Sequence, residues 1–162
     1  MVEPKDVVQQ AIGYYELGLL AEADDLLDRG VPEALSVEYL HLRILVKIDR
    51  EQWAEAEAFS TQGIDLFPER SFGYIQRAYA LHELKRTREA AEVLEKAPVD
   101  SKDKVEDILA YNLACYYAQL GEDQRALEML REAIRHNSAL WQDACEDPDF
   151  ASLHGRLDGL KP

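Results

Sequence analysis

The feature that most constrains the fold of this chain is an alanine that recurs at nearly constant intervals. It stands at Ala23, Ala56, Ala90 and Ala126, each time after Glu or Arg, with intervals of 33, 34 and 36 residues. A fixed period of this size is typical of stacked helical repeats, in which each unit packs mainly on its neighbours. The period therefore predicts a solenoid of four similar units.

Further positions follow the same period. These are Gly30, Gly63, Ala97 and Ala133 seven residues after the alanine, Leu27, Ser60, Leu94 and Leu130 four residues after it, and Ala11, Ile44, Ala78 and Ala114 twelve residues before it. Ile44 and Ser60 depart most clearly from the pattern. Two helices that cross at about 8–10 Å need small residues where their backbones meet and large apolar residues beside them. Each unit is therefore predicted to be a helical hairpin.

The apolar spacing and the turn residues predict where these helices lie. The predicted ranges are 4–17, 21–30, 34–49, 52–65, 71–84, 87–97, 104–120 and 123–136. Gly18 and Gly121 fall between paired helices, where a tight turn favours glycine. Glu51 and Lys85 take that place in the middle units, which leaves their turn geometry open but not their helix pairing. The charged segment 98–107 is predicted to be a connecting loop.

Three segments give the chain a resemblance to the tetratricopeptide repeat family. Tyr111–Ile134 carries the features of that family nearly intact, and Ala11–Leu27 and Arg50–Phe59 repeat parts of them. The resemblance covers about residues 4 to 137. It implies an all-α fold, a right-handed superhelical solenoid of antiparallel helix hairpins. Residues 1–137 would hold four repeats, at about 4–36, 37–70, 71–106 and 107–137.

Residues 138–162 break the repeat and are predicted to cap the array. Asp147 and Pro148 form a good helix start, because Asp caps free N–H groups and Pro is tolerated at the first helical position. Trp141, Phe150 and Leu153 then offer an apolar face that would cover the exposed end of the last repeat. The segment 147–154 also resembles a tail that follows such repeats in bacterial proteins, so a bacterial origin is expected.

Composition restricts the possible partners. The chain has 18 Lys and Arg against 32 Asp and Glu, a net charge of -14, which disfavours nucleic acid and an anionic membrane surface. No apolar stretch approaches the roughly 20 residues that span a bilayer. Cys115 and Cys145 lack metal-ligand spacing and are predicted to be free thiols in a reducing compartment, so a cytoplasmic location is expected.

No sequence motif indicates catalysis. The chain has no Gly-rich phosphate loop, no GxSxG and no HExxH. His154 could contact a metal together with Asp147 and Asp149, but these acids stand where helix N-termini ordinarily carry them. We therefore expect no enzyme activity, no cofactor and no metal.

The resemblance implies a binding groove lined by the first helix of each hairpin. The candidate groove residues are Tyr15, His41, Leu42, Leu45, Phe72, Gln76, Tyr79, His82, Tyr111, Asn112 and Cys115. Family members that clamp a carboxylate use Lys, Arg and Asn on this face, because a carboxylate needs charge-assisted donors. That set is missing here. The groove is apolar and aromatic, and it is edged by the carboxylates of Glu16, Glu38, Asp49 and Glu83.

These features predict a non-catalytic protein-interaction scaffold or adaptor. Its partner would be a peptide or helix that is hydrophobic with basic flanks. One alternative is a secretion-type chaperone that shields a hydrophobic segment, and another is a constitutive assembly subunit. The apolar residues could instead pack against neighbouring helices, the chain's own tail or a second copy in a homodimer.

Overall fold

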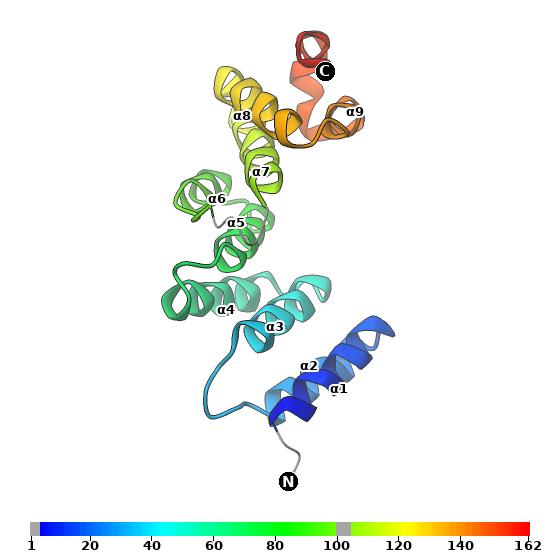
Figure 1. Cartoon of the computed structure of the whole chain (residues 1–162), viewed down its shortest axis with the longest axis vertical. Helices are drawn as coiled ribbons and strands as arrows, with labels where there is room; N and C mark the ends of the chain where they lie inside the picture. Colours follow the sequence, from blue (N-terminus) through cyan, green and yellow to red (C-terminus); the bar gives the residue numbers. More distant parts are fainter. Residues whose placement is uncertain (1–3, 100–104) are drawn as a thin grey trace.

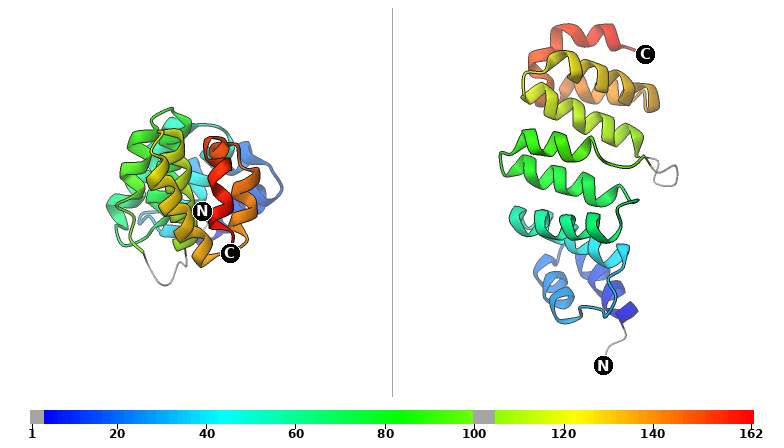
Figure 2. Two further views of the ribbon diagram at one scale, coloured as in Figure 1. Left: turned by 90° about the horizontal axis from the view of Figure 1, so that it is seen from above. Right: turned by 90° about the vertical axis from the view of Figure 1, so that its left-hand side faces the viewer.

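The molecule is an elongated stack of helical hairpins, shown by a computed structural model that describes residues 4–99 and 105–162. The eight hairpin helices are α1 (Pro4–Glu16), α2 (Leu20–Arg29), α3 (Val37–Asp49), α4 (Trp53–Leu66), α5 (Phe72–Glu83), α6 (Thr87–Leu94), α7 (Glu106–Gln119) and α8 (Asp123–His136). Successive helices lie side by side and form layers along the long axis (Figures 1 and 2). The predicted all-α solenoid is confirmed.

The residues that keep the repeat period lie where the helices meet. Ala23, Ala56, Ala90 and Ala126 are each 0% exposed, and so are Leu27, Ser60 and Leu130. The four residues twelve positions earlier, Ala11, Ile44, Ala78 and Ala114, are also 0% exposed. Ser60, which departs from the apolar pattern, satisfies its buried hydroxyl by donating to the Ala56 carbonyl at 2.7 Å. The positions that follow the repeat period are therefore the positions at which helices contact one another.

All four turns within the hairpins share one backbone conformation. Gly18 and Gly121 have a φ of 73°, while Glu51 and Lys85 have φ values of 56° and 64°. In each turn the amide after this residue bonds to a carbonyl five residues earlier, as from Gln52 to Lys47 at 2.8 Å. The turn geometry that the sequence left open is therefore the same in all units, and two non-glycine residues adopt the left-handed region to keep it.

Some helix ends differ from the predicted ones by up to three residues. The α3 helix begins at Val37 and not at residue 34, because Ser36 caps it by accepting from the Tyr39 amide at 3.2 Å. The α6 helix ends at Leu94, three residues before the predicted end at 97. In the predicted loop 98–107, α7 already begins at Glu106, and residues 100–104 lie outside the described residues.

Charged side chains link the turn of one hairpin to the second helix of the preceding one. In the α3–α4 turn Arg50 pairs with Asp24 of α2, and in the α5–α6 turn Arg86 pairs with Glu57 of α4 at 2.8 Å. Glu122, before α8, pairs with Arg88 of α6. Asp24 is buried and also holds Lys47, at 2.7 Å. The more exposed pairs, Arg86–Glu57 and Arg88–Glu122, contribute little to stability, so they align the hairpins more than they stabilise them.

The C-terminal segment folds back onto the last hairpin. It contains α9 (Leu140–Glu146), η1 (Pro148–Leu153), α10 (His154–Leu157) and η2 (Asp158–Leu160). Asp147 caps η1 by accepting from the Asp149 amide at 2.9 Å, as the sequence predicts for a helix start, although the helix is of the 3-10 type. Phe150 and Leu153 are 0% exposed and share a core with α7 and α8. The Trp141 indole donates to the Leu157 carbonyl at 3.1 Å.

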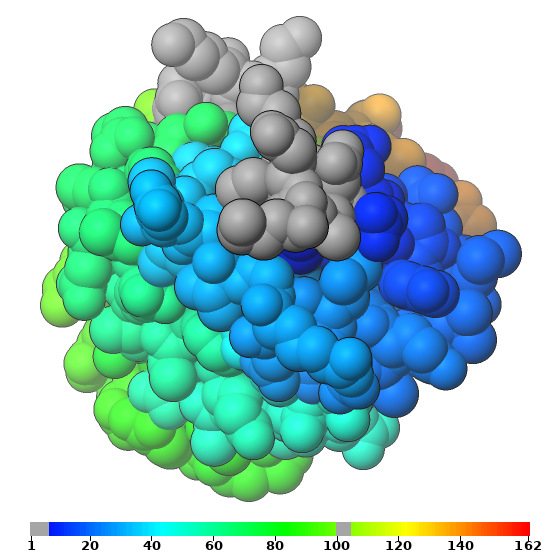
Figure 3. Space-filling model, turned by 90° about the horizontal axis from the view of Figure 1, so that it is seen from below, coloured from blue at the N-terminus to red at the C-terminus, as the bar shows by residue number. Residues whose placement is uncertain are grey.

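The apolar interior forms two clusters that meet in α5. One cluster runs from Ala11 in α1 to α4 and includes Phe72 and Ala80 of α5. The other includes Ala78 and Leu81 of α5 and continues through α6, α7, α8 and the C-terminal segment. Seen from its N-terminal end, the molecule shows the first hairpin and the segment that follows it in front, with later hairpins visible beside them (Figure 3).

Candidate binding groove

The first helices of the four hairpins, α1, α3, α5 and α7, form one continuous surface, which we call the first-helix groove. Both ends of the molecule curve toward the side on which α3, α5 and α7 lie (Figure 1). Direct contacts join neighbouring first helices: the Tyr15 hydroxyl donates to Asp49 at 2.6 Å, and the rings of His41 and Phe72 lie 5.4 Å apart. The Gln119 amide nitrogen lies 3.5 Å from a His82 ring nitrogen.

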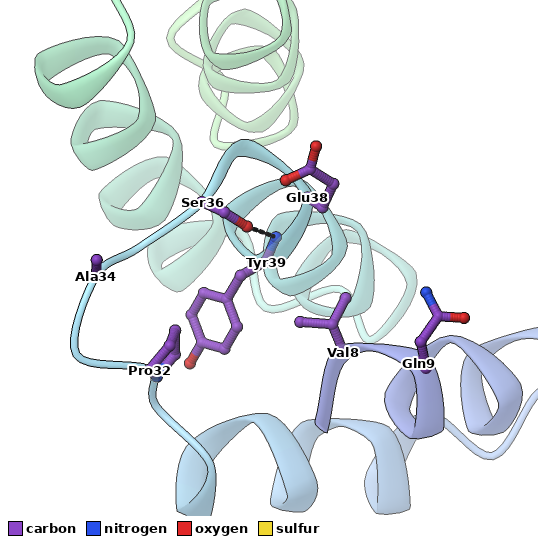
Figure 4. Close-up of a pocket in the computed structure, with 7 residues that line it drawn as sticks. All are labelled: Val8, Gln9, Pro32, Ala34, Ser36, Glu38 and Tyr39. Atoms are coloured by element: carbon purple, nitrogen blue, oxygen red, sulfur yellow. Dashed lines mark hydrogen bonds between the residues drawn. The ribbon is translucent and has the colours of Figure 1, made fainter. Parts of the chain in front are cut away.

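Two pockets open where these helices begin. The first lies between α1, α3 and the loop before α3, and has a volume of about 440 Å³. Val8 and Tyr39 point toward one another across it, with Pro32 beside the tyrosine hydroxyl and Glu38 at its edge (Figure 4). Its lining is therefore mainly apolar.

The second pocket lies between α3, α5 and α7 and brings predicted groove residues together. His41, Phe72 and Gln76 line it, and its volume is about 360 Å³. Val37, Ile75, Val105 and Ile108 complete its apolar wall, and Arg70 and Ser71 stand at its edge. Ile108 is 46% exposed, so this wall is open to solvent or to a partner.

Tyr79 is the exposed aromatic of the groove. Its ring lies edge-on to Trp53 at 5.7 Å, and 39% of the residue is exposed. Partial burial raises the pKa of its phenol, and the nearby carboxylates of Glu83, Asp49 and Glu51 raise that pKa further. Trp53, the first residue of α4, is half-buried and supports the Tyr79 ring. Glu51 was missed as a groove residue because the sequence pattern marks it only as a turn position.

The other candidates of the first three units are less accessible. Leu42 is buried in the N-terminal core cluster, and Leu45 is half-buried. Tyr15 is held by Asp49, and partial burial together with this hydrogen bond raises the pKa of its phenol to about 12. His82 stacks on Tyr116 at 5.1 Å, and its Nδ1 lies 3.1 Å from the Thr87 hydroxyl. These residues shape the groove wall more than they offer free surface.

The C-terminal segment lies against the candidates of the fourth unit. Tyr111 donates to Asp147 at 2.9 Å and packs edge-on to Phe150 at 5.5 Å. Gln119 donates to Asp149 at 2.8 Å. Cys115 is buried beside the same segment, while Asn112 is half-buried and its side chain makes no hydrogen bond among the described residues. The chain's own tail thus occupies this end of the groove, which the sequence left as one of three options.

One group of possible metal ligands appears at this contact. The sulfur of Cys115 and carboxylate oxygens of Asp147 and Asp149 lie within 4.8 Å of one another. Asp147 already accepts from Tyr111 and from the Asp149 amide, and Asp149 accepts from Gln119. Burial, followed by the two carboxylates, raises the pKa of the Cys115 thiol, so the thiol stays protonated. Helix capping and hydrogen bonding therefore account for this arrangement, and His154 takes no part in it.

The stacked helical hairpins give the molecule the fold of a tetratricopeptide-repeat-like solenoid. No family profile matches the sequence, and no curated protein matches it. Among the described residues, no helix is long and apolar enough to cross a membrane.

Solved structures show the same architecture. A thermophilic tetratricopeptide repeat protein from Thermus thermophilus, TTC0263, matches with a TM-score of 0.69 and 17% identity over 98% of both chains. The structure described as MamA MSR-1 C2 matches with a TM-score of 0.70 and 18% identity over 85% of this chain and 79% of the other. A MamA RS-1 double mutant matches with a TM-score of 0.74 and 16% identity over 85% and 77%. The predicted resemblance is confirmed as a likeness of fold.

Proposed function

We propose that this chain is a non-catalytic protein-interaction scaffold whose first-helix groove binds a segment of a partner protein. The observation that carries the proposal is the open apolar surface between α3, α5 and α7. Tyr79 and Ile108 are 39% and 46% exposed there, next to the pocket of His41 and Phe72. Exposed aromatic and aliphatic groups around a pocket are the usual anchors of a protein interface.

The groove favours a hydrophobic segment with basic flanks. Its apolar pockets suit large aliphatic or aromatic side chains. Glu38 stands at the edge of the first pocket, and Glu16, Asp49 and Glu83 stand at the far ends of α1, α3 and α5. A free C-terminal carboxylate would meet repulsion from these acids. Such a partner is compatible with an adaptor, with a secretion-type chaperone or with a constitutive assembly subunit. Both cysteines are unpaired, in keeping with a reducing compartment such as the cytoplasm.

Capture from native lysate with two matched double variants tests the proposal. Tyr79→Ala with Ile108→Ser should abolish capture of a specific partner, because it removes both exposed anchors without opening the core. Leu17→Ala with Leu66→Ala, which trims residues that are 75% and 49% exposed outside these pockets, should leave capture unchanged. Helical content should be the same in all three proteins. Equal recovery of the partner by the wild type and by the Tyr79 variant would refute the groove as the binding site.

A further inference from the structure

A row of carboxylates marks the ends of the first three first helices. Glu16, Asp49 and Glu83 are the last residues of α1, α3 and α5. They are separated by 33 and 34 residues, the same intervals that separate the first three repeat alanines. We call these three residues the acidic row. The fourth member of the series, 36 residues on, is the neutral Gln119, which the C-terminal segment engages through Asp149.

The acidic row is electrostatically unfavourable for the isolated chain. The C-terminal end of a helix carries a partial negative charge, so cations are favoured there and carboxylates are not. Among the described residues, none of the three carboxylates forms an ion pair. Asp49 accepts only the neutral hydroxyl of Tyr15.

Nearby cations do not neutralise the row. Arg50, which follows α3, is held by Asp24, and Arg86, which follows α5, is held by Glu57 and Glu89. Lys85 stands in the same turn as Arg86 but pairs with none of the row carboxylates. Glu51 adds a further negative charge beside Tyr79, with Asp49 and Glu83. Within the part of the chain that the structure describes, the groove therefore keeps a negative edge that no cation pairs with.

The row and the pockets lie on opposite long edges of the groove. His41 and Gln76 line the pocket near the helix starts, and Asp49 and Glu83 follow them by eight and seven residues. At 1.5 Å per residue the two edges are about 10–12 Å apart, which is also the diameter of an α-helix with its side chains. Between them lies the exposed ring of Tyr79.

We propose that the groove binds an amphipathic partner helix that presents an apolar face to the pockets and a line of Lys or Arg to the acidic row. This inference rests on the proposed function and specifies its partner. Packed helices lie about 8–10 Å apart, so successive row carboxylates would meet basic residues spaced by about five to seven positions on the partner helix. The partner is expected to carry basic residues because they complement the charge of the acidic row. It is expected to be a helix because the width of the groove matches the diameter of one.

Three designed peptides of about 18 residues test the charge preference. Each forms a helix with a Leu face, and the edge positions carry Lys, Gln or Glu. Fluorescence anisotropy should show the Lys probe binding at least about tenfold more tightly than the Gln probe, and the Glu probe weakest of all. The preference for Lys should shrink at high salt, because exposed charge pairs are screened.

Paired variants test the residues. Asp49→Asn with Glu83→Gln should weaken binding of the Lys probe about tenfold and leave the Gln probe unchanged. Glu55→Gln with Glu92→Gln removes the same charge from exposed sites on α4 and α6 and should change either affinity less than about twofold. Glu83→Gln alone should also unfold at a higher temperature, since it removes an unfavourable helix-end charge and leaves the Tyr15–Asp49 bond intact. Asp49→Lys with Glu83→Lys should reverse the preference toward the Glu probe.

Two results would overturn the inference. One is equal binding of the Lys and Gln probes. The other is an equal loss of Lys-probe affinity in the control variant, which would show only the attraction of a protein with a net charge of -14.

If the probes bind without charge preference but still lose affinity in the Tyr79→Ala and Ile108→Ser variant, the scaffold function stands without the acidic row. If that variant binds every probe as the wild type does, the groove itself is excluded.

Discussion

At the scale of single residues, the left-handed turn position is the most demanding site in the chain. Non-glycine residues adopt this region at a cost of roughly 1–2 kcal/mol, yet Glu51 and Lys85 occupy it in the two middle hairpins. The chain therefore stores a small strain there that glycine would remove. Gly18 and Gly121 show the relaxed form of the same turn.

Glycine should stabilise the middle turns, and alanine should destabilise the outer ones. Lys85→Gly should raise the free energy of unfolding by up to about 1 kcal/mol, the gain at positive φ being offset in part by the greater freedom of glycine in the unfolded chain. Gly121→Ala should lower it by about 1 kcal/mol or more, although its added Cβ would meet open space. Urea unfolding measures both. Gly159→Ala, also open but without positive φ, is the control, and a similar loss there would argue against backbone strain.

A second prediction at this scale concerns Tyr15 and alkaline pH. The pKa of its phenol is about 12 in the folded chain, against about 10 when exposed. Because the folded state holds the phenol proton more tightly, the protonated Tyr15 contributes to the free energy of unfolding. This contribution is complete below pH 10 and is lost as the pH rises from 10 to 12. Thermal midpoints measured from pH 8 to pH 11 should fall less steeply for Tyr15→Phe than for the wild type. Parallel curves would show that the Tyr15–Asp49 bond does not couple α1 to α3.

At the scale of helices, the backbones of α4 and α5 approach each other closely at Gly73. A Cβ on Gly73 would lie 3.0 Å from the Ile64 backbone nitrogen and 3.2 Å from the Ser60 carbonyl oxygen. Backbone atoms cannot move aside as a flexible side chain can. Gly73→Ala should therefore destabilise the protein by about 1–3 kcal/mol, as overpacking does.

The matched control for this contact is Gly13→Ala in α1. Nothing lies within 4 Å of a Cβ at Gly13, so alanine should stabilise that helix by about 0.5–1 kcal/mol. Chemical unfolding of both variants gives the comparison. Equal effects of the two substitutions would mean that helix propensity, and not the close approach of α4 and α5, decides the result.

Most of the helix pairing could be predicted from the sequence, because it depends on small residues that recur with the repeat. Ala23, Ala56, Ala90 and Ala126 all mark buried helix contacts. The ends were less predictable: the start of α3 depends on a single cap at Ser36, which periodicity does not detect. The apolar residues of the C-terminal segment were enough to predict that it caps the array. The contacts of Asp147 and Asp149 with α7 could not be predicted, since they join residues far apart in the sequence.

The repeat alignment predicts which residues share the first-helix surface, but not how accessible each of them is. The repeat alignment placed His41, Phe72 and Gln76 on one surface, and the structure joins them in a pocket. The alignment could not distinguish Tyr79, which is exposed, from Leu42, which the neighbouring helices cover. The difference in exposure arises from how neighbouring hairpins stack, and the residues around a single position do not indicate that stacking.

At the scale of the whole molecule, the C-terminal segment completes the second core cluster. Phe150 is fully buried against Tyr111, so Phe150→Ala should cost about 3–5 kcal/mol of the stability of that cluster. Hydrogen exchange followed by mass spectrometry should show the loss of protection in α7 and α8 and little change in α1 to α3. A uniform loss along the chain would mean that the molecule opens only as one unit.

The division of the apolar interior inside α5 has a consequence for folding. Ala80 belongs to the N-terminal cluster, while its near neighbours Ala78 and Leu81 belong to the other, so different sides of one helix pack into the two clusters. Repeat arrays gain stability by nearest-neighbour coupling, and here that coupling passes through a helix of 12 residues. Local opening of α5 would therefore separate the two clusters beside the pocket that His41 and Phe72 line, and a partner bound in the proposed groove would also hold the two clusters together.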